Sequence, residues 1–159
     1  MPRIPAAIEP VFERFVSGPA TIRRAIDGLD AAAFSRRPPG EDWSIRDIVV
    51  HLADAELVGA VRFRLSIAEE RPQLPVYDHE LWKRRLHYLF RDPEFALSSF
   101  QTTRYGTAEL LQQCSADVWQ REAVHPERGV MTVADLLELY ALHAQEHAAQ
   151  VAAFREAMR

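Results

Sequence analysis

The sequence predicts an all-α protein, a four-helix bundle with additional short helices. Two kinds of observation favour this fold: long segments carry apolar residues at helical spacing, and residues typical of helix caps precede them. In addition, no segment alternates between polar and apolar residues over more than a few positions, as a half-buried strand would. With 159 residues and 48% hydrophobic composition, the chain is the right size for a single globular domain spanning residues 1–159.

Two long helices are predicted to begin at capping boxes. Ser44 is followed three residues later by Asp47, so the stretch from Ser44 to about Glu70 is expected to form one helix. Thr132 and Asp135 repeat the pattern before the last segment of the chain. The apolar stripe of that last segment, which we expect to face a core, consists of Val133, Leu137, Tyr140, Ala144, His147, Val151 and Phe154.

The other elements are predicted from proline positions and periodicity. Pro93 stands at a first helical position and opens the helix PEFALSSFQTTRYGTAELLQQC, and DHELWKRRLHYLF forms a shorter helix before it. The segment before Ser44 also favours helix, with an interruption near Ser17-Gly18-Pro19. HPERGVM predicts a turn and at most a small hairpin.

Composition excludes several classes of function. The formal net charge is −4, and lysines and arginines are scattered among acids, so no basic face is offered to a nucleic-acid backbone. MPRIPAAIEPVFERF lacks the apolar core of a signal peptide and no run is long enough to span a membrane, so a cytoplasmic protein without membrane contact is expected. The single cysteine, Cys114, excludes an internal disulfide and a cysteine-based zinc cluster, and we expect it to pack rather than act as a nucleophile.

The stretch HAQEH places two histidines one helical turn apart. His143 and His147 project from one face of the predicted helix, His147 inside the apolar stripe and His143 at its edge. Both therefore point toward the bundle interior, where a charged pair would be costly. Histidine pairs at this spacing are more often solvent-facing or separately hydrogen-bonded than metal-bound, so the pair alone does not define a site.

His51 supplies a third candidate ligand. It lies in the middle of the helix that begins after Ser44, on the side shared by Ile48, Ala55 and Val58, and so points inward. A lone histidine on an apolar face is usually a satisfied core residue, but three converging neutral imidazoles suit a divalent transition metal with water completing the shell. The remaining histidines are expected to be solvated, and these are His79, His87 and His125.

Four stretches resemble the DinB-like superfamily of helical metalloproteins, and within it the bacillithiol transferase-like branch, whose members were often labelled metal-dependent hydrolases. They are WSIRDIVVHLADAE, VRFRLSIAEE, PVYDHELW and YALHAQEHAAQV, and the resemblance covers roughly residues 38 to 153. It implies a four-helix bundle that binds one divalent metal through His51, His143 and His147. Because the expected ligands are imidazoles, nickel or zinc is the expected metal, with iron or manganese as alternatives. The resemblance also implies a homodimer.

The resemblance favours an enzyme that acts on a small molecule. In the main hypothesis, the metal activates a low-molecular-weight thiol co-substrate for S-transfer to an electrophilic substrate. The first alternative is a metal-dependent hydrolase that uses metal-bound water. The second is a non-catalytic protein, either a bundle that binds metal only for stability or a metal-free dimerising module. A structural metal site would usually close four protein ligands around the ion.

The stretch PVYDHELW is expected to cover or line the pocket, because it matches the same branch. Tyr77 is a candidate catalytic hydrogen-bond donor, Asp78 a candidate proton acceptor, and Trp82 a candidate apolar wall of the substrate pocket. The alternative is that Tyr77 and Trp82 merely cap the bundle.

Three charged residues of the Ser44 helix also have two interpretations each. Asp54 either orients the His51 imidazole or is a solvated helix charge. Arg62 and Arg64 either attract an anionic thiol or substrate or form ordinary surface salt bridges.

Overall fold

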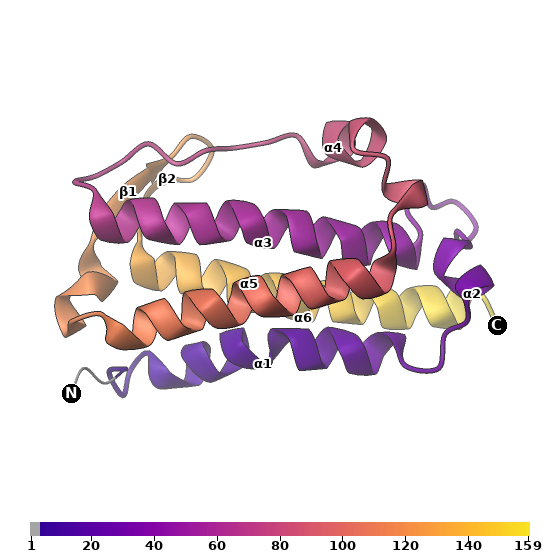
Figure 1. Ribbon diagram of the computed structural model, residues 1–159, viewed down its shortest axis with the longest axis horizontal. Coiled ribbons are helices and arrows are strands. Elements are labelled where there is room, and N and C mark those ends of the chain that lie inside the picture. The colour runs from indigo at the N-terminus through magenta and orange to yellow at the C-terminus, as the bar shows by residue number, and fades with distance from the viewer. Residues whose placement is uncertain (1–3) are drawn as a thin grey trace.

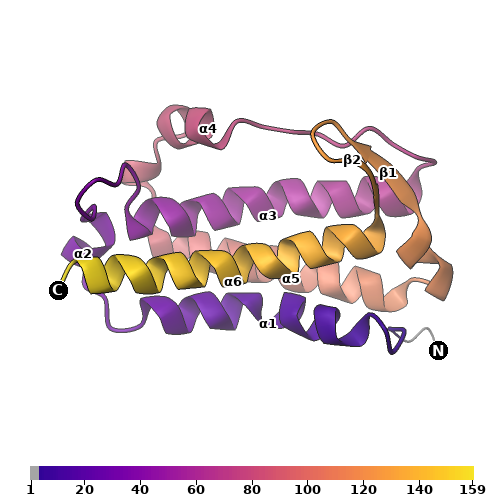
Figure 2. The same ribbon diagram turned by 180° about the vertical axis from the view of Figure 1, so that it is seen from behind.

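Four long helices lie side by side in the computed structural model, which describes residues 4–159 (Figures 1 and 2). They are α1 (Glu9–Ile26), α3 (Ile45–Ala68), α5 (Pro93–Gln113) and α6 (Val133–Ala157). The most extensive contacts join α1 to α6 and α3 to α5. This architecture confirms the predicted four-helix bundle, and within residues 4–159 no helix has the length and apolar character needed to cross a membrane.

The shorter elements gather on one side and at the ends of the bundle. They are the helices α2 (Ala31–Ser35) and α4 (His79–Arg85), the 3₁₀ helices η1 (Tyr88–Phe90) and η2 (Ala116–Gln120), and the antiparallel hairpin of β1 (Glu122–His125) and β2 (Gly129–Thr132). Residues 70–78, which we call the strap, run outside α3 back toward α4 (Figure 1). Leu74 donates its amide to the Val124 carbonyl, so the strap is fastened to the hairpin.

Capping boxes fix where the two ligand-bearing helices begin, as predicted. Ser44 and Asp47 each accept a hydrogen bond from the other's backbone amide at the start of α3, and Thr132 and Asp135 do the same at the start of α6. Because side chains follow a helix at 100° per residue, each box also fixes which side chains of its helix face the bundle interior.

The predicted interruption near Ser17-Gly18-Pro19 is wrong, because α1 continues through Pro19. Pro19 has no amide hydrogen, so the carbonyl of Phe15 loses its helical donor. Arg104 of α5 donates to that carbonyl at 2.8 Å instead. Gly18 makes this approach possible, since a β-carbon there would lie 2.6 Å from Nη1 of Arg104.

The same arginine connects all four long helices. Nε and Nη2 of Arg104 bind the two oxygens of Glu56 on α3 at 2.7 Å each, and Nη2 also donates to the Tyr140 carbonyl on α6 at 3.2 Å. Burial raises the pKa of the Glu56 carboxyl, and the guanidinium opposes that rise by binding both oxygens. The ion pair is completely enclosed and joins α1, α3, α5 and α6 at one point.

We expect Arg104→Met to lower the free energy of unfolding by about 3–5 kcal/mol, because it leaves the Glu56 carboxylate buried without a counter-ion. Urea denaturation followed by circular dichroism measures this loss. The control is Arg14→Met, which breaks the half-exposed pair with Glu138 and should cost less than about 1 kcal/mol. Equal losses in the two variants would contradict the central role of Arg104.

Candidate metal centre

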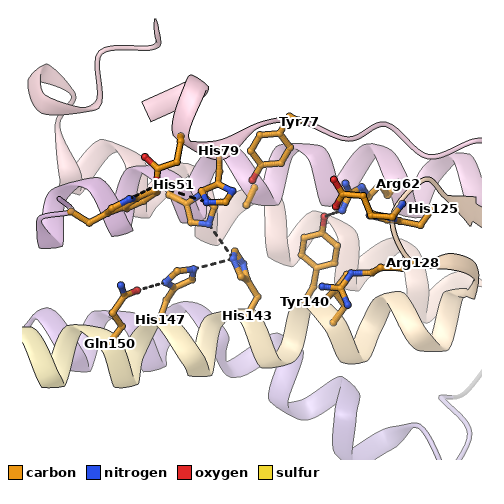
Figure 3. Close-up of a pocket in the computed structure, with 15 residues that line it drawn as sticks. His51, Arg62, Tyr77, His79, His125, Arg128, Tyr140, His143, His147 and Gln150 are labelled. Atoms are coloured by element: carbon orange, nitrogen blue, oxygen red, sulfur yellow. Dashed lines mark hydrogen bonds and ion pairs between the residues drawn. The ribbon is translucent and has the colours of Figure 1, made fainter. Parts of the chain in front are cut away.

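The structure brings the three predicted ligands together between α3 and α6. Nε2 of His143 lies 3.1 Å from Nε2 of His51 and 3.0 Å from Nε2 of His147 (Figure 3). Two nitrogens bound to one ion at about 2.0–2.1 Å are at most about 4.2 Å apart, and both separations meet that limit. All three ring nitrogens lie within 4.8 Å of one another, so this group could hold a single divalent cation.

The imidazoles are held in the neutral form that ligands need. Burial lowers the pKa of His51 to about 3, and it also lowers the pKa values of His143 and His147. Oε1 of Gln150 lies 2.8 Å from Nδ1 of His147 and can only accept. That bond keeps the proton on Nδ1 and leaves the Nε2 lone pair directed at the cluster.

His51 has a different environment. Its Nδ1 is buried and has no hydrogen-bond partner among residues 4–159, and Trp43 packs edge-on against the ring with centroids 5.5 Å apart. Neither interpretation of Asp54 is correct, because this carboxylate is buried and binds Arg91 at 2.7 Å. Arg91 follows η1 directly, so Asp54 is bonded to the end of that helix and not to the His51 ring.

A cavity of about 460 Å³ opens beside the histidine cluster, bounded by α3, α6, the strap, the start of α4 and the hairpin. His51, His143 and His147 lie toward one end (Figure 3). Tyr77 and Tyr140 lie in the middle, and Arg62, His125 and Arg128 lie at the opposite end. The cluster therefore borders a space large enough for a small molecule.

Of the three residues predicted in PVYDHELW, the structure brings Tyr77 to the cavity. Burial raises the pKa of its phenol, so Tyr77 keeps its proton and can donate. Trp82 stacks on Tyr77 with centroids 4.3 Å apart but is not part of the cavity lining. Asp78 also lies outside the lining, because its carboxylate caps α4 by accepting from the Leu81 amide at 2.9 Å.

The lining also includes residues that were not predicted as parts of a site, among them Glu80, His79 and His125. Glu80 lines the cavity and accepts from Nε1 of Trp43 at 2.6 Å, and the His79 ring lies 6.0 Å from the ring of His51. The expectation that His125 is solvated is wrong, because alternate residues of β1 face inward and His125 is only 4% exposed. The side chain of His79 is largely exposed, although one side of it borders the cavity.

Arg62 and Arg64, the two arginines with two possible roles each, lie in different environments. Arg62 is buried and lines the cavity. Arg64 follows it by two residues and is exposed on the other side of α3, where it donates to the Ala60 carbonyl.

Cys114, also singled out in the sequence, is half-buried at the end of α5, and burial raises the pKa of its thiol. That shift disfavours the thiolate, in line with a packing role.

The sequence profile described as the DinB superfamily matches residues 14–151. The chain belongs to this superfamily. A protein named "Putative metal-dependent hydrolase YfiT" from Bacillus subtilis is 27% identical over 84% of this chain and 75% of its own. A second relative, "Putative metal-dependent hydrolase BH0277" from Halalkalibacterium halodurans, is 23% identical over 84% of this chain and 77% of its own length.

Solved structures share the fold. The structure of YfiT from Bacillus subtilis, described as "a probable metal-dependent hydrolase with an unusual four-helix bundle topology", superposes with a TM-score of 0.88 at 24% identity, over 95% of this chain and 87% of that one. A mycothiol-dependent maleylpyruvate isomerase superposes with a TM-score of 0.75 at 14% identity, over 91% of this chain and 60% of that one. Both likenesses establish the fold of this DinB-superfamily chain.

We expect the protein to bind about one zinc ion per chain and His51→Ala to weaken binding by more than about 100-fold. Gln150→Ala, which frees Nδ1 of His147, should weaken it by about 10- to 100-fold. Competition with a zinc chelator measures these affinities in protein made without a histidine tag. His125→Ala is the matched control, a buried cavity histidine outside the cluster, and zinc affinity lost equally in this variant would contradict the assignment.

The metal-free protein should lose stability on acidification. The folded-state pKa of His51 is about 3 and the unfolded value is about 6.5, so between these the unfolded chain binds more protons. The stabilising contribution is complete above pH 6.5 and is lost as pH falls. From pH 7 to 5 we expect His51 alone to account for about 2 kcal/mol. Urea denaturation in EDTA should show a smaller pH dependence in His51→Leu, and an unchanged one would refute the prediction.

Proposed function

We propose that this protein is a metal-dependent hydrolase of small substrates, with its ion held by His51, His143 and His147. The observation that carries the proposal is that three ring nitrogens converge at the wall of a cavity rather than inside a closed core. A structural zinc site usually closes four protein ligands around the ion. Among residues 4–159 the converging metal-binding groups number three, which leaves coordination positions for water and substrate.

The chemistry divides between the ion and the chain. A divalent ion in such a site lowers the pKa of a bound water and polarises a carbonyl or phosphoryl oxygen. Glu80 lines the same cavity and is our candidate proton acceptor for the attacking water. Tyr77 keeps its phenolic proton and is our candidate donor to the oxygen on which negative charge develops.

The identity of the metal and the assembly state are also proposals. Imidazole ligands suit zinc and nickel, and we propose one of these two, with iron or manganese as alternatives. The family resemblance supports a homodimer, and this stays a prediction.

Thiol S-transfer is the second candidate function. Its support is that a protein with this fold is described as a mycothiol-dependent isomerase. In this reaction the thiol would replace water as the nucleophile, and the same three histidines would hold the ion that favours its thiolate. The names of the relatives favour hydrolysis, which is why we rank S-transfer second.

Zinc-loaded or nickel-loaded protein is expected to hydrolyse members of a panel of small chromogenic esters and amides without added thiol. Glu80→Gln should lower kcat by about 100-fold or more while the metal content stays unchanged, because it removes the proton acceptor and no ligand. Glu94→Gln, an exposed carboxylate on α5, is the matched control and should retain activity.

The other outcomes decide between the candidates. Turnover of an electrophile only in the presence of bacillithiol, mycothiol or glutathione would replace hydrolysis by S-transfer. Metal binding without turnover of the esters and amides, and without thiol-dependent turnover of an electrophile, would identify a non-catalytic bundle.

A further inference from the structure

Arg62 is a buried cation without a buried counter-ion. Its side chain lies on α3 and the residue is only 7% exposed. Nε and Nη2 donate to the Pro75 carbonyl at 3.0 and 2.7 Å, and Nη1 donates to the Tyr140 hydroxyl at 3.1 Å. Within residues 4–159 no carboxylate oxygen lies within 4.0 Å of this guanidinium.

The contrast with Arg104 shows how unusual this is. Arg104 is buried even more completely, but both oxygens of Glu56 neutralise it. Burying a guanidinium whose charge is met only by a carbonyl and a hydroxyl is costly, so a stable fold tends to retain such a group for another role. Arg62 lines the cavity, where a ligand can supply the missing negative charge.

Hydrogen-bond donors remain free at this end of the cavity. A guanidinium has five N–H groups, and the three bonds of Arg62 leave two without a partner. The Tyr140 hydroxyl accepts from Arg62, so its own hydrogen is available, and burial raises the pKa of Tyr140, which keeps that hydrogen in place. Both side chains lie between the histidine cluster and the hairpin (Figure 3).

The hairpin adds two further groups. Nδ1 of His125 accepts from the Glu127 amide at 3.2 Å, which places the ring proton on Nε2 as a donor. Arg128 lines the same end from the exposed rim. Glu127 is the carboxylate that lines the cavity here, and it is exposed, so it does not neutralise Arg62.

We propose that Arg62, assisted by Tyr140 and His125, binds a carboxylate group of the substrate at the end of the cavity opposite the three histidines. This inference rests on the proposed function for the choice of the cavity as the substrate site. The backbones of His51 and Arg62 are eleven residues apart on one face of α3, about 16 Å along the helix axis. Their functional groups are closer than this, because Arg62 donates to the Tyr140 hydroxyl and the centroid of the Tyr140 ring lies 6.5 Å from that of the His143 ring. The substrate is accordingly an elongated acid, with its reacting carbonyl at the histidines and its carboxylate several bonds away.

Arg62 also has a purely structural use, because it holds the strap through the Pro75 carbonyl. Loss of the arginine would then affect all ligands alike. A role in binding a carboxylate instead predicts that charged ligands lose more than uncharged ligands of the same shape, so the test compares matched pairs of ligands.

The probes are monohydroxamates of straight-chain dicarboxylic acids with four to eight carbons, each paired with its methyl ester. The hydroxamate is a metal-binding group, and the two members of a pair differ only at the other end, where a small uncharged methyl ester replaces the charged carboxylate. Calorimetric titrations use zinc-loaded and metal-free protein, with every compound titrated against both forms. At one or more chain lengths the acid should bind about tenfold more tightly than its ester.

Arg62→Gln should reduce this acid-to-ester ratio to about one, and Tyr140→Phe should reduce it by a smaller factor while keeping the ring. Arg64→Gln is the matched control, because it removes the same charge two residues away on the exposed side of α3, and its ratio should stay at the parent value. If Arg62→Gln does not fold, as judged by circular dichroism, Tyr140→Phe and the parent ratio still decide the question.

The outcomes separate this inference from the proposed function. Equal binding of acid and ester at every length, or an unchanged ratio in the folded Arg62→Gln variant, would overturn the carboxylate site. Hydroxamate affinity that does not depend on zinc would count against the metal centre, while the ratio in metal-free protein would still report on Arg62.

Discussion

One buried guanidinium determines how the four long helices meet. Arg104 binds a carboxylate of α3 and carbonyls of α1 and α6 from its position on α5, so each long helix has a fixed height relative to the others. The carbonyl on α1 is available because Pro19 cannot donate to it. A proline and a glycine that would ordinarily weaken a helix thus create the acceptor and the space that the ion pair requires.

A second close contact sets the distance between the two helices that carry the histidines. A β-carbon at Gly59 of α3 would lie 2.5 Å from the ring of Tyr140, so only glycine lets the helices approach this closely. Tyr140 therefore makes three contacts: its ring fills the space at Gly59, its carbonyl accepts a hydrogen bond from Arg104, and its hydroxyl accepts one from Arg62. Through this residue, the packing of the bundle and the lining of the cavity depend on each other.

The site residues that lie on long helices could be predicted from the sequence, because helix periodicity determines which way their side chains point. Capping boxes and apolar stripes gave the register of α3 and α6, and register alone directed His51, His143 and His147 inward. Periodicity could not reveal partners contributed by loops. Asp78, at the end of the strap, caps α4, whereas Glu80, in the first turn of α4, lines the cavity, although both are carboxylates in one short stretch. Likewise, burial of His125 follows from strand alternation in a hairpin too short to recognise securely, and Asp54 is paired with Arg91, 37 residues away.

The strap has a consequence for how this fold can change. The three histidines stand on rigid helices, whereas Tyr77, Glu80, His125 and Arg128 come from the strap, the start of α4 and the hairpin. Loops accept substitutions and insertions more readily than packed helices do. The strap and the hairpin are joined to each other by backbone hydrogen bonds, so they form one cover over the cavity that can change as a unit. In evolution, a lineage can therefore change its preferred substrate by altering this cover, while the helices that carry the three histidines stay the same.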